Sequence, residues 1–587
     1  MKYTLTDTNG NAAKPASALS ALLKLWPLLK DEKKNLVLAL IAITLNSGLT
    51  LLAPLLIGHT IDTYIQTFHY QGVLLFAGIL LGIYLVAFVA NYFQTMLMGG
   101  VGQRLLFSLR NAVFHKLQEL PVAFFNQNKA GDLISRINND TDKLNQFFSQ
   151  ALLQFVSNAF IIVGAGIFLL TINIKLGAFA LVPALGLLIL TQALSAWIRR
   201  KNAASMQALG GMSGEIQESL ANFKVVVAFN RRDYFRKKFD EANETNYSTS
   251  IKAGVANNIF TPIYGFCGNL AQLIVLAFGI YLITAGAFTV GLLVSYLVYV
   301  TRFYDPLRQL ASVWSSFQTA MAAWDRISAI MSLASDMVVI PGGETIPGAH
   351  LLALENVHFH YPDGKEVLHG INLTLEEGKT YALVGPTGGG KTTTASLMAR
   401  LYDPTEGKVL LHGKDIRSFE PSERTKNIGF ILQEPFLFSG TVRENILYGN
   451  DEYKHLSNED IVVALQKANV DTLLSHFEKG LETSVTSGGG EISLGQRQLI
   501  AFMRAVLKDP DVLILDEATA NIDTVTEKLL EEILQNLPKH TTRVIIAHRL
   551  NTIENADEIY FVNAGEVIQA GSFDHAVEML LHQERQS

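Results

Sequence analysis

Cysteine is almost absent from the chain, which has one such residue, Cys267, in 587 positions. A single cysteine excludes an internal disulfide and any metal site built from several thiolates. Net charge is also small, at −6, and gives no reason to expect nucleic acid as the main partner. Residues 1–17 are polar and lack the basic start and apolar centre of a signal peptide. A chain of this length is expected to form more than one domain.

Charged residues are missing from long stretches of the first half of the chain. A helix of about 20 apolar residues spans a bilayer. Of five uncharged stretches, the first four are long enough for one span each. The fifth is long enough for two, with a turn expected within 284–291. We therefore predict six spans. A further short apolar stretch, 19–29, suits a helix at the membrane surface, with a packed helix of a soluble domain as the alternative. The uncharged stretches are 35–61, 63–103, 144–174, 176–198 and 253–301.

Basic residues gather in two of the loops between these stretches. Residues 104–143 carry six Lys or Arg and residues 199–252 carry ten, whereas 58–71 and 284–291 carry none. By the positive-inside rule, both termini and the two long loops are cytoplasmic. Apolar residues at helical spacing within 107–120 and 206–241 predict helices that continue out of the bilayer, with compact turns at 124–132. We expect these loops to contact the second domain.

Short apolar strands alternate with helical segments after about residue 350. This alternation predicts an α/β domain with a largely parallel sheet. The strands are expected at 351–354, 381–384, 429–432, 512–515 and 544–547. The predicted organisation is a cytoplasmic N-terminus (1–34), an all-α transmembrane domain (35–335), a linker (336–350) that contains the glycine- and proline-rich stretch 341–348, and the α/β domain (351–587).

A glycine-rich turn lies between the strand expected at 382–384 and a helix expected at 393–401. It fits G-x-x-x-x-G-K-[ST], and a strand before it and a helix after it are the context that a phosphate-binding loop requires. Glycines let several backbone N–H groups point inward, and the helix N-terminus adds partial positive charge. Lys391 would reach the β- and γ-phosphates, and Thr392 would hold Mg²⁺. The expected nucleotide-binding residues here are Gly385, Pro386, Thr387, Gly388, Gly389, Gly390, Lys391, Thr392 and Thr393.

Two carboxylates follow the apolar run Val512–Leu515. In phosphoryl transfer one carboxylate helps to hold Mg²⁺ while another group orients or deprotonates the attacking water. Asp516 fits the first role and Glu517 the second. A second glycine-rich stretch, 487–498, leads into a helix, and Ser493 and Gly495 there could bind another phosphate or could form a turn without any ligand.

Residues 351–587 resemble the nucleotide-binding domain of ABC transporters, with six motifs in the family's order. The resemblance implies an aromatic residue that stacks on adenine, a Q-loop glutamine at Mg²⁺ and the attacking water, a signature motif, a D-loop and a switch histidine at the γ-phosphate. The corresponding residues are Tyr361, Gln433, Ser493 with Gly495 and Gln496, Asp523 and His548. Catalytic roles are implied for Glu517, His548 and Gln433, and metal-binding roles for Thr392, Gln433 and Asp516.

The first half resembles the six-helix domain of ABC exporters with long intracellular helices. Residues 124–140 are similar to the family's first intracellular loop, where a short coupling helix docks on the nucleotide domain. Residues 215–229 lie where a second coupling helix is expected. The resemblance implies a dimer in which the signature of one chain closes the phosphate loop of the other. The predicted fold is therefore a helical transmembrane domain joined to an α/β P-loop NTPase domain with a helical subdomain.

The signature departs from the family pattern. The usual L-S-G-G-Q reads Ile492-Ser-Leu-Gly-Gln496, Ser487 replaces the acidic residue that often precedes it, and the D-loop at 520–523 reads Ala-Asn-Ile-Asp. The catalytic residues are intact. This combination is similar to the competent chain of heterodimeric exporters, whose altered signature faces a degenerate site on the partner. An active homodimer is the alternative.

The sequence thus predicts an ATP-driven export half-transporter of the cytoplasmic membrane that uses ATP and Mg²⁺ and pairs with a second half-transporter chain. ATP binding would close the dimer and move the coupling helices, and hydrolysis would reset it. Amphipathic drugs or lipids are the expected cargo, and nucleic acid is not an expected partner. A dedicated lipid flippase or a peptide exporter is an alternative, although no peptidase domain with a catalytic Cys and His is seen before the spans. The six uncharged spans argue against a soluble ATP-dependent clamp or translation factor, and a fused chain argues against an importer.

Overall fold

The computed structural model describes residues 3–5, 26–341, 350–362, 364–486, 488, 492–516, 524–546 and 554–571, together with 574, 575 and 578. The chain divides into two compact units. The helical unit comprises Asp7–Leu117 and Gly131–Ser332. The sheet unit comprises Met1–Thr6, Gln118–Ala130 and Leu333–Ser587, so two segments from early in the chain belong to it. The linker expected at 336–350 is described only up to residue 341 and at 350.

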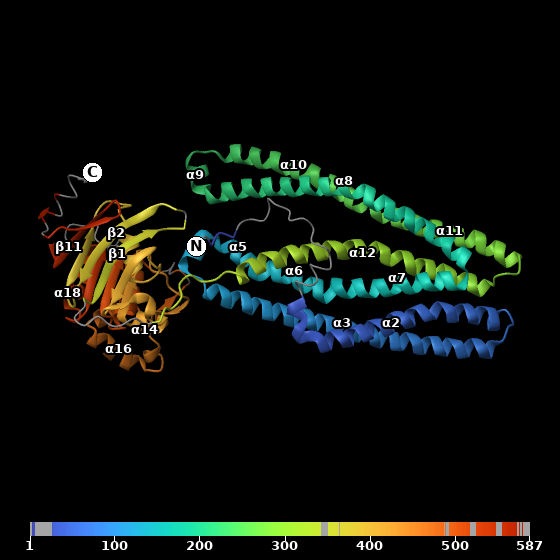
Figure 1. Ribbon diagram of the computed structural model, residues 1–587, viewed down its shortest axis with the longest axis horizontal. Coiled ribbons are helices and arrows are strands. Elements are labelled where there is room, and N and C mark those ends of the chain that lie inside the picture. Colours follow the sequence, from blue (N-terminus) through green and yellow to red (C-terminus); the bar gives the residue numbers. More distant parts are fainter. Residues whose placement is uncertain are drawn as a thin grey trace. The chain divides into compact units, whose positions relative to one another are not determined.

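Long helices make up most of the helical unit (Figure 1). α3 and α8 continue well past their uncharged stretches, as the spacing of apolar residues predicts. α9 (Phe223–Ala228) occupies the bend between α8 and α10, whereas α5 (Ala130–Ser135) and α6 (Thr141–Gln146) are parts of the continuous helical stretch Ala130–Ile172 that ends with α7. The long helices are α2 (Lys33–Thr60), α3 (Tyr70–Gln118), α7 (Leu152–Ile172), α8 (Ile174–Ala221), α10 (Arg232–Asn258), α11 (Phe260–Thr284) and α12 (Val290–Met331).

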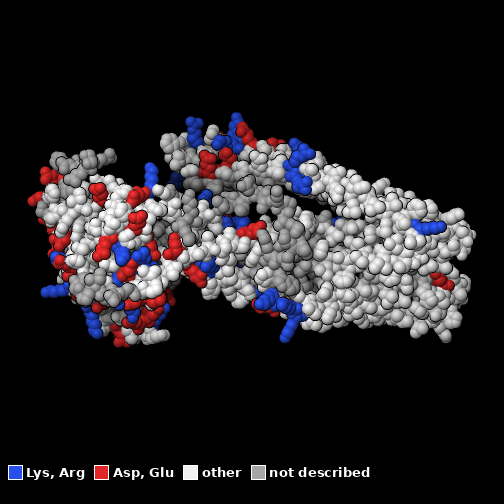
Figure 2. All heavy atoms as spheres, viewed as in Figure 1, with Lys and Arg blue, Asp and Glu red and all other residues white. Residues whose placement is uncertain are grey.

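Five helical stretches among the described residues are long and apolar enough to cross a membrane. The sixth span stays a prediction, because the apolar start of α12 gives way to Arg302 within the same helix. The predicted turn before it is confirmed, since α11 ends at Thr284 and α12 begins at Val290. Figure 2 shows a broad surface of the helical unit with few charged side chains, whereas they are dense on the sheet unit. The five stretches are Lys30–Ile65, Tyr70–Gln118, Ala130–Ile172, Ile174–Ala221 and Arg232–Thr284.

Hydroxyl groups on α12 tie it to its neighbours. Tyr299 Oη donates to the carbonyl of Leu51 on α2 at 2.6 Å, and Tyr304 Oη donates to that of Ala180 on α8 at 2.8 Å. Ser295 Oγ donates to the carbonyl of Pro54 at 2.7 Å. These side chains are buried, and a buried hydroxyl without a partner is costly in an apolar medium. Several polar groups of the spans therefore serve contacts between helices, as do Asn158 with Gln309 and Gln272 with Thr301.

Two glycines let α2 and α12 approach closely near the start of α12. A Cβ atom added at Gly58 would meet the carbonyl oxygen of Gly291 at 2.6 Å, and one added at Gly291 would meet that of Gly58. The Asp62 carboxylate lies beside this crossing, accepts the backbone N–H of Gly291 at 2.7 Å and accepts the Thr289 hydroxyl at 2.5 Å. The carboxylate thereby satisfies orphan donors at the first turn of α12.

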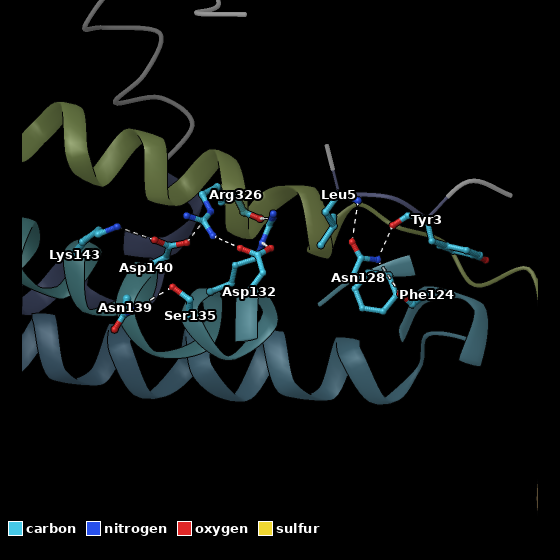
Figure 3. A network of polar contacts seen from close by, with 11 residues as sticks. Tyr3, Leu5, Phe124, Asn128, Asp132, Ser135, Asn139, Asp140, Lys143 and Arg326 are labelled. Carbon is cyan, nitrogen blue, oxygen red and sulfur yellow. Dashed lines mark hydrogen bonds and ion pairs between the residues drawn. The ribbon is translucent and has the colours of Figure 1, made fainter. Parts of the chain in front are cut away.

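A network of ion pairs joins α5 and α6 to α12 within the helical unit (Figure 3). Arg326 of α12 contacts Asp132 at 2.5 Å and the fully buried Asp140 at 3.1 Å. Asp140 also pairs with Lys143 at 3.0 Å, and Arg136 pairs with Asp132 at 2.8 Å. Each buried charge thus has an opposite charge beside it, which offsets its desolvation.

The sheet unit contains a six-stranded sheet in the order β12-β11-β3-β10-β9-β6. All neighbours pair in parallel except β11 and β12, so the largely parallel sheet is confirmed. A separate antiparallel sheet has the order β2-β1-β4-β5. The strands of the first sheet are β3 (Thr380–Val384), β6 (Ile428–Ile431), β9 (Val512–Asp516), β10 (Thr542–Ile546), β11 (Glu558–Asn563) and β12 (Glu566–Gln569), and those of the second are β1 (Leu352–His360), β2 (Glu366–Leu375), β4 (Glu406–Leu411) and β5 (Lys414–Asp415).

Helices contribute to two of the apolar cores of the sheet unit. α13 (Lys391–Met398) contributes to the core shared by β1, β2, β3 and β9. α17 (Leu494–Val506), α15 (Val442–Ile446), α16 (Asn458–Lys467) and α18 (Thr524–Asn536) contribute to the other, together with residues of β6 and β9. The helical subdomain stays a prediction. The remaining elements are α4 (Val122–Gln127), α14 (Pro421–Asn427) and the short strands β7 (Gly440–Thr441) and β8 (Ser484–Val485).

Candidate nucleotide-binding site

The phosphate-binding loop has the predicted strand, turn and helix around it. β3 ends at Val384, and α13 begins at Lys391. Gly385 and Gly390 have φ of +146° and +114°, a backbone conformation that strongly favours glycine. A Cβ atom at Gly385 would also collide with the carbonyl oxygen of Val562. The loop therefore needs glycine at these two positions for conformation and for packing.

Lys391 is buried at the centre of this loop, with only 5% of the residue exposed. Its Nζ donates to the carbonyl oxygens of Gly385 at 2.8 Å and Pro386 at 3.0 Å. The ammonium group is thus held inside the turn whose N–H groups would surround a phosphate. The described contacts support the predicted role of Lys391 in phosphate binding.

Thr392 and Asp516 are brought together although they lie 124 positions apart. Thr392 is in the first turn of α13, and Asp516 ends β9. The Thr392 Oγ1 donates to Asp516 Oδ1 at 3.3 Å. β9 is buried along its whole length, and Asp516 is 5% exposed. The pair presents oxygen atoms of the kind that Mg²⁺ prefers.

Gln433 follows β6, the parallel neighbour of β9. Ile431 of β6 pairs with Leu515 of β9. Gln433 follows Ile431 by two residues and Asp516 follows Leu515 by one, so both lie at the carboxyl ends of neighbouring strands. Carboxyl ends of parallel strands meet at one edge of a sheet, where α/β proteins bind their ligands. Gln433 is exposed at that edge.

Tyr361 lies beside the phosphate loop, as its predicted adenine-stacking role requires. Its Oη is 3.0 Å from Thr393 Oγ1 on α13. Its ring meets Phe359 edge-on at 4.9 Å and Tyr402 edge-on at 5.4 Å, which fixes the plane of the ring. Tyr402 could not be identified from the sequence as part of the site, because an aromatic residue between α13 and the turn at Asp403-Pro404 matches no functional motif.

The signature residues form the start of α17. Ser493 Oγ accepts the backbone N–H of Gln496 at 3.1 Å, and the Gln496 side chain accepts that of Ser493 at 3.0 Å. This reciprocal pair is a capping box, so the altered signature retains a well-formed helix N-terminus. Ser493 is exposed and Gly495 is buried. Glu517, Asp523 and His548, like Ser487 and the rest of the D-loop, lie outside the described residues.

The fold and site define a nucleotide-binding α/β domain joined in one chain to a helical membrane domain. A family model of the ABC transporter transmembrane region matches residues 36–307, and a model of the ABC transporter matches 368–520. The chain belongs to the ABC transporter family, as an exporter half-transporter with one transmembrane half and one ATP-binding half. It couples ATP hydrolysis to transport, and it is a multi-pass protein of the cell membrane with its nucleotide-binding domain in the cytoplasm.

Similar proteins include exporters of lipids and of drugs. An uncharacterized ABC transporter ATP-binding protein, YfiC of Bacillus subtilis, is 33% identical over 96% of this chain and 93% of its own length. An ATP-dependent lipid A-core flippase of Syntrophus aciditrophicus is 32% identical over 84% of this chain and 81% of its own. The ABC multidrug transporter mdr2 of Aspergillus fumigatus is 33% identical over 94% and 71% respectively. The chain thus falls among exporters of the multidrug and lipid type.

Proposed function

We propose that this chain exports amphipathic drugs or lipids as one half of a dimer, by alternating access. An apolar cavity of about 880 Å³ in the helical unit carries this proposal. No charged side chain lines it among the described residues, and its polar side-chain groups are the hydroxyls of Thr191 and Tyr264 and the indole N–H of Trp314. Apolar pockets with few polar groups suit ligands with a large apolar part. Its aromatic lining consists of Phe147, Phe155, Tyr264, Phe303, Trp314 and Phe317.

Export into sealed inside-out vesicles tests this function. We expect ATP-dependent uptake of a fluorescent lipid analogue or drug, reduced several-fold by Leu188→Trp because the indole fills the cavity that Leu188 lines. The matched control is Leu190→Trp, a partly exposed position two residues away that does not line the cavity. Wild-type uptake by the filled variant would contradict the role of the cavity, and absence of ATP-dependent uptake would contradict the proposed cargo class.

We propose that Mg²⁺ binds with ATP at Thr392 and Asp516, with Gln433 as a further contact. Their hydroxyl, carboxylate and amide oxygens fit a hard cation that completes its shell with water and substrate phosphates. Bound Mg²⁺ supplies charge neutralisation on the transferring phosphoryl group. Glu517 would orient and deprotonate the attacking water, and His548 would contact the γ-phosphate. The short distance between Thr392 and Asp516 supports this assignment.

We further propose that a partner chain completes the site at Lys391. The exposed Ser493 at the start of α17 would in return bind the nucleotide of the partner. The altered signature favours a heterodimer in which this chain holds the competent catalytic residues, and a homodimer is the alternative. The N-terminus of α17 carries partial positive charge, which favours an anion and supports this role.

Two exposed apolar surfaces support association. In the helical unit, α9 exposes Phe223, Val225 and Val227 at 51%, 55% and 42%. In the sheet unit, a groove of about 240 Å³ beside β6 and α17 is lined by Phe436 and Phe438, among others. Each of these two groups of neighbouring apolar side chains is more extensive than the isolated apolar residues that protein surfaces normally carry. We propose that α9 of one chain docks in this groove on its partner.

A photo-crosslinker in place of Val225 tests the docking and identifies the partner. In native membranes we expect an adduct near twice the chain mass of 64.5 kDa, joined to a peptide that aligns with residues 428–438. The same crosslinker at Val226, which is 4% exposed, is the matched control and should give no adduct. A peptide from a different chain supports the heterodimer, a peptide of this sequence supports the homodimer, and no adduct contradicts the docking.

A further inference from the structure

The short helix α4 lies in the sheet unit, apart in sequence from the rest of that unit. It begins after Pro121 and ends before Asn128, both of which have extended backbones. Phe124 is fully buried and Ala123 is 8% exposed. A helix of six residues has little stability of its own. Its position therefore depends on the side chains that hold it on each side.

On one side, the segment Tyr3–Leu5 pairs with the end of α4 (Figure 3). Tyr3 N donates to Gln127 Oε1 at 2.9 Å, and Leu5 N donates to Asn128 Oδ1 at 3.0 Å. Asn128 Nδ2 donates to the Tyr3 carbonyl at 3.0 Å and to the Phe124 carbonyl at 2.8 Å. One amide side chain thus binds both the segment and the helix, much as a neighbouring strand would.

The Tyr3 side chain joins this pair to the chain that leaves α12. The residue is 1% exposed, and its ring meets Phe124 edge-on at 6.4 Å. Its hydroxyl accepts the N–H of Asp336 at 3.0 Å and donates to the carbonyl of Ala334 at 3.3 Å. Burial raises the pKa of the Tyr3 hydroxyl, which keeps the donor proton in place. Both hydrogen-bonding capacities of the phenol are used.

On the other side, α4 contacts the tyrosine that packs on Tyr361. Asn126 Nδ2 donates to Tyr402 Oη at 2.7 Å. The Tyr402 ring meets Tyr361 edge-on at 5.4 Å, and the Tyr361 hydroxyl lies 3.0 Å from Thr393 Oγ1. A series of direct contacts therefore runs from Tyr3 through α4 to the helix of the phosphate loop.

We propose that Tyr3 is a positioning residue for the nucleotide site. Its hydroxyl, bound to Ala334 and Asp336, anchors the Tyr3 backbone and ring that hold α4. Asn126 of α4 then holds Tyr402, and Tyr402 holds the ring of Tyr361 in the plane that stacks on adenine. This inference rests on the adenine-stacking role predicted for Tyr361. Its consequence is specific: loss of the Tyr3 hydroxyl disturbs recognition of the base and leaves recognition of the phosphates unchanged, because Lys391 and the glycines are held by their own contacts.

The test compares ATP with inorganic tripolyphosphate, which has the phosphates and no base. In the full-length protein, Tyr3→Phe is expected to raise the Kd for ATP roughly 3- to 10-fold, the effect of one hydrogen bond. The inhibition constant of tripolyphosphate for ATP hydrolysis should not change. Asn126→Ala should give the same pattern. If either variant is combined with Tyr402→Phe, the Kd for ATP should rise by less than the product of the two separate fold-changes.

Tyr560→Phe is the matched control. Tyr560 is also buried in the sheet unit, and its hydroxyl donates to the carbonyl of Thr374 at 3.1 Å. It should change neither constant. Equal weakening of ATP and tripolyphosphate by Tyr3→Phe would show a general structural effect and overturn the inference, as would no change in either. Tyr361→Ala distinguishes the adenine role of Tyr361 from the positioning role of Tyr3. If this variant leaves ATP binding intact, the adenine role fails, and if it alone weakens ATP binding, only the positioning role fails.

Discussion

Lys391→Ala is expected to weaken ATP binding by about tenfold or more, the cost of removing a charged hydrogen-bond donor from a buried phosphate site. The ammonium group is enclosed by the loop and donates to the carbonyl oxygens of Gly385 and Pro386. Its loss removes the positive charge that β- and γ-phosphates would meet. Titration with a fluorescent ATP analogue measures the change.

Lys414→Ala is a suitable control for that variant. Lys414 is an exposed lysine of β5 in the same unit, so the control removes an equal charge away from the loop. We expect no change in its affinity for ATP. An unchanged affinity in Lys391→Ala would remove Lys391 from the site, even if hydrolysis were lost.

Glu517→Gln is expected to reduce steady-state ATP hydrolysis by about 100- to 10,000-fold, the usual contribution of a positioned general base. Affinity for ATP should be preserved, because the amide is nearly isosteric and the phosphate loop is untouched. The neighbouring residue, Asp516, ends the buried strand β9 and accepts the Thr392 hydroxyl. β9 thus ends at the edge of the sheet where α/β proteins bind their ligands, and the role of Glu517 is inferred from its place directly after Asp516 in the sequence.

Turnover and binding must be measured separately for this variant. Glu558→Gln is the control, since Glu558 begins β11 in the same sheet and pairs with Lys379 at 3.1 Å. It should keep normal turnover. Near-normal turnover in Glu517→Gln would exclude Glu517 as the base, and loss of ATP binding would assign it a structural role instead.

Local patterns in the sequence predict the secondary structure around the phosphate-binding loop well. The strand, glycine turn and helix around Lys391 are each determined by neighbouring residues, and β9 is recognisable as an apolar run before two acids. The turn before α12 is likewise predicted by a short polar stretch with glycines. Residues 124–132, expected as compact turns, instead contain most of α4 and the start of α5, because the tertiary contacts of Phe124 and Asn128 stabilise a helical turn too short to stand alone.

Contacts between distant segments could not be predicted. Tyr3 meets residues 124 and 331 positions away, and no periodicity in the sequence reports such a contact. The same holds for Asn126 and Tyr402, which are 276 positions apart. The antiparallel strands β2 and β4 are also absent from the predicted strands, and their pairing with β1 defines them.

The crossing of α2 and α12 has a further consequence. Because the Cβ positions of Gly58 and Gly291 are occupied by backbone atoms of the opposite helix, a single methyl group at either place would act as a spacer. The two helices would separate, and the hydrogen bonds that Ser295 and Tyr299 make to α2 would lengthen with them. The distance between α2 and α12 at this crossing is thus set by the absence of two side chains. The close packing of the two helices depends on that distance.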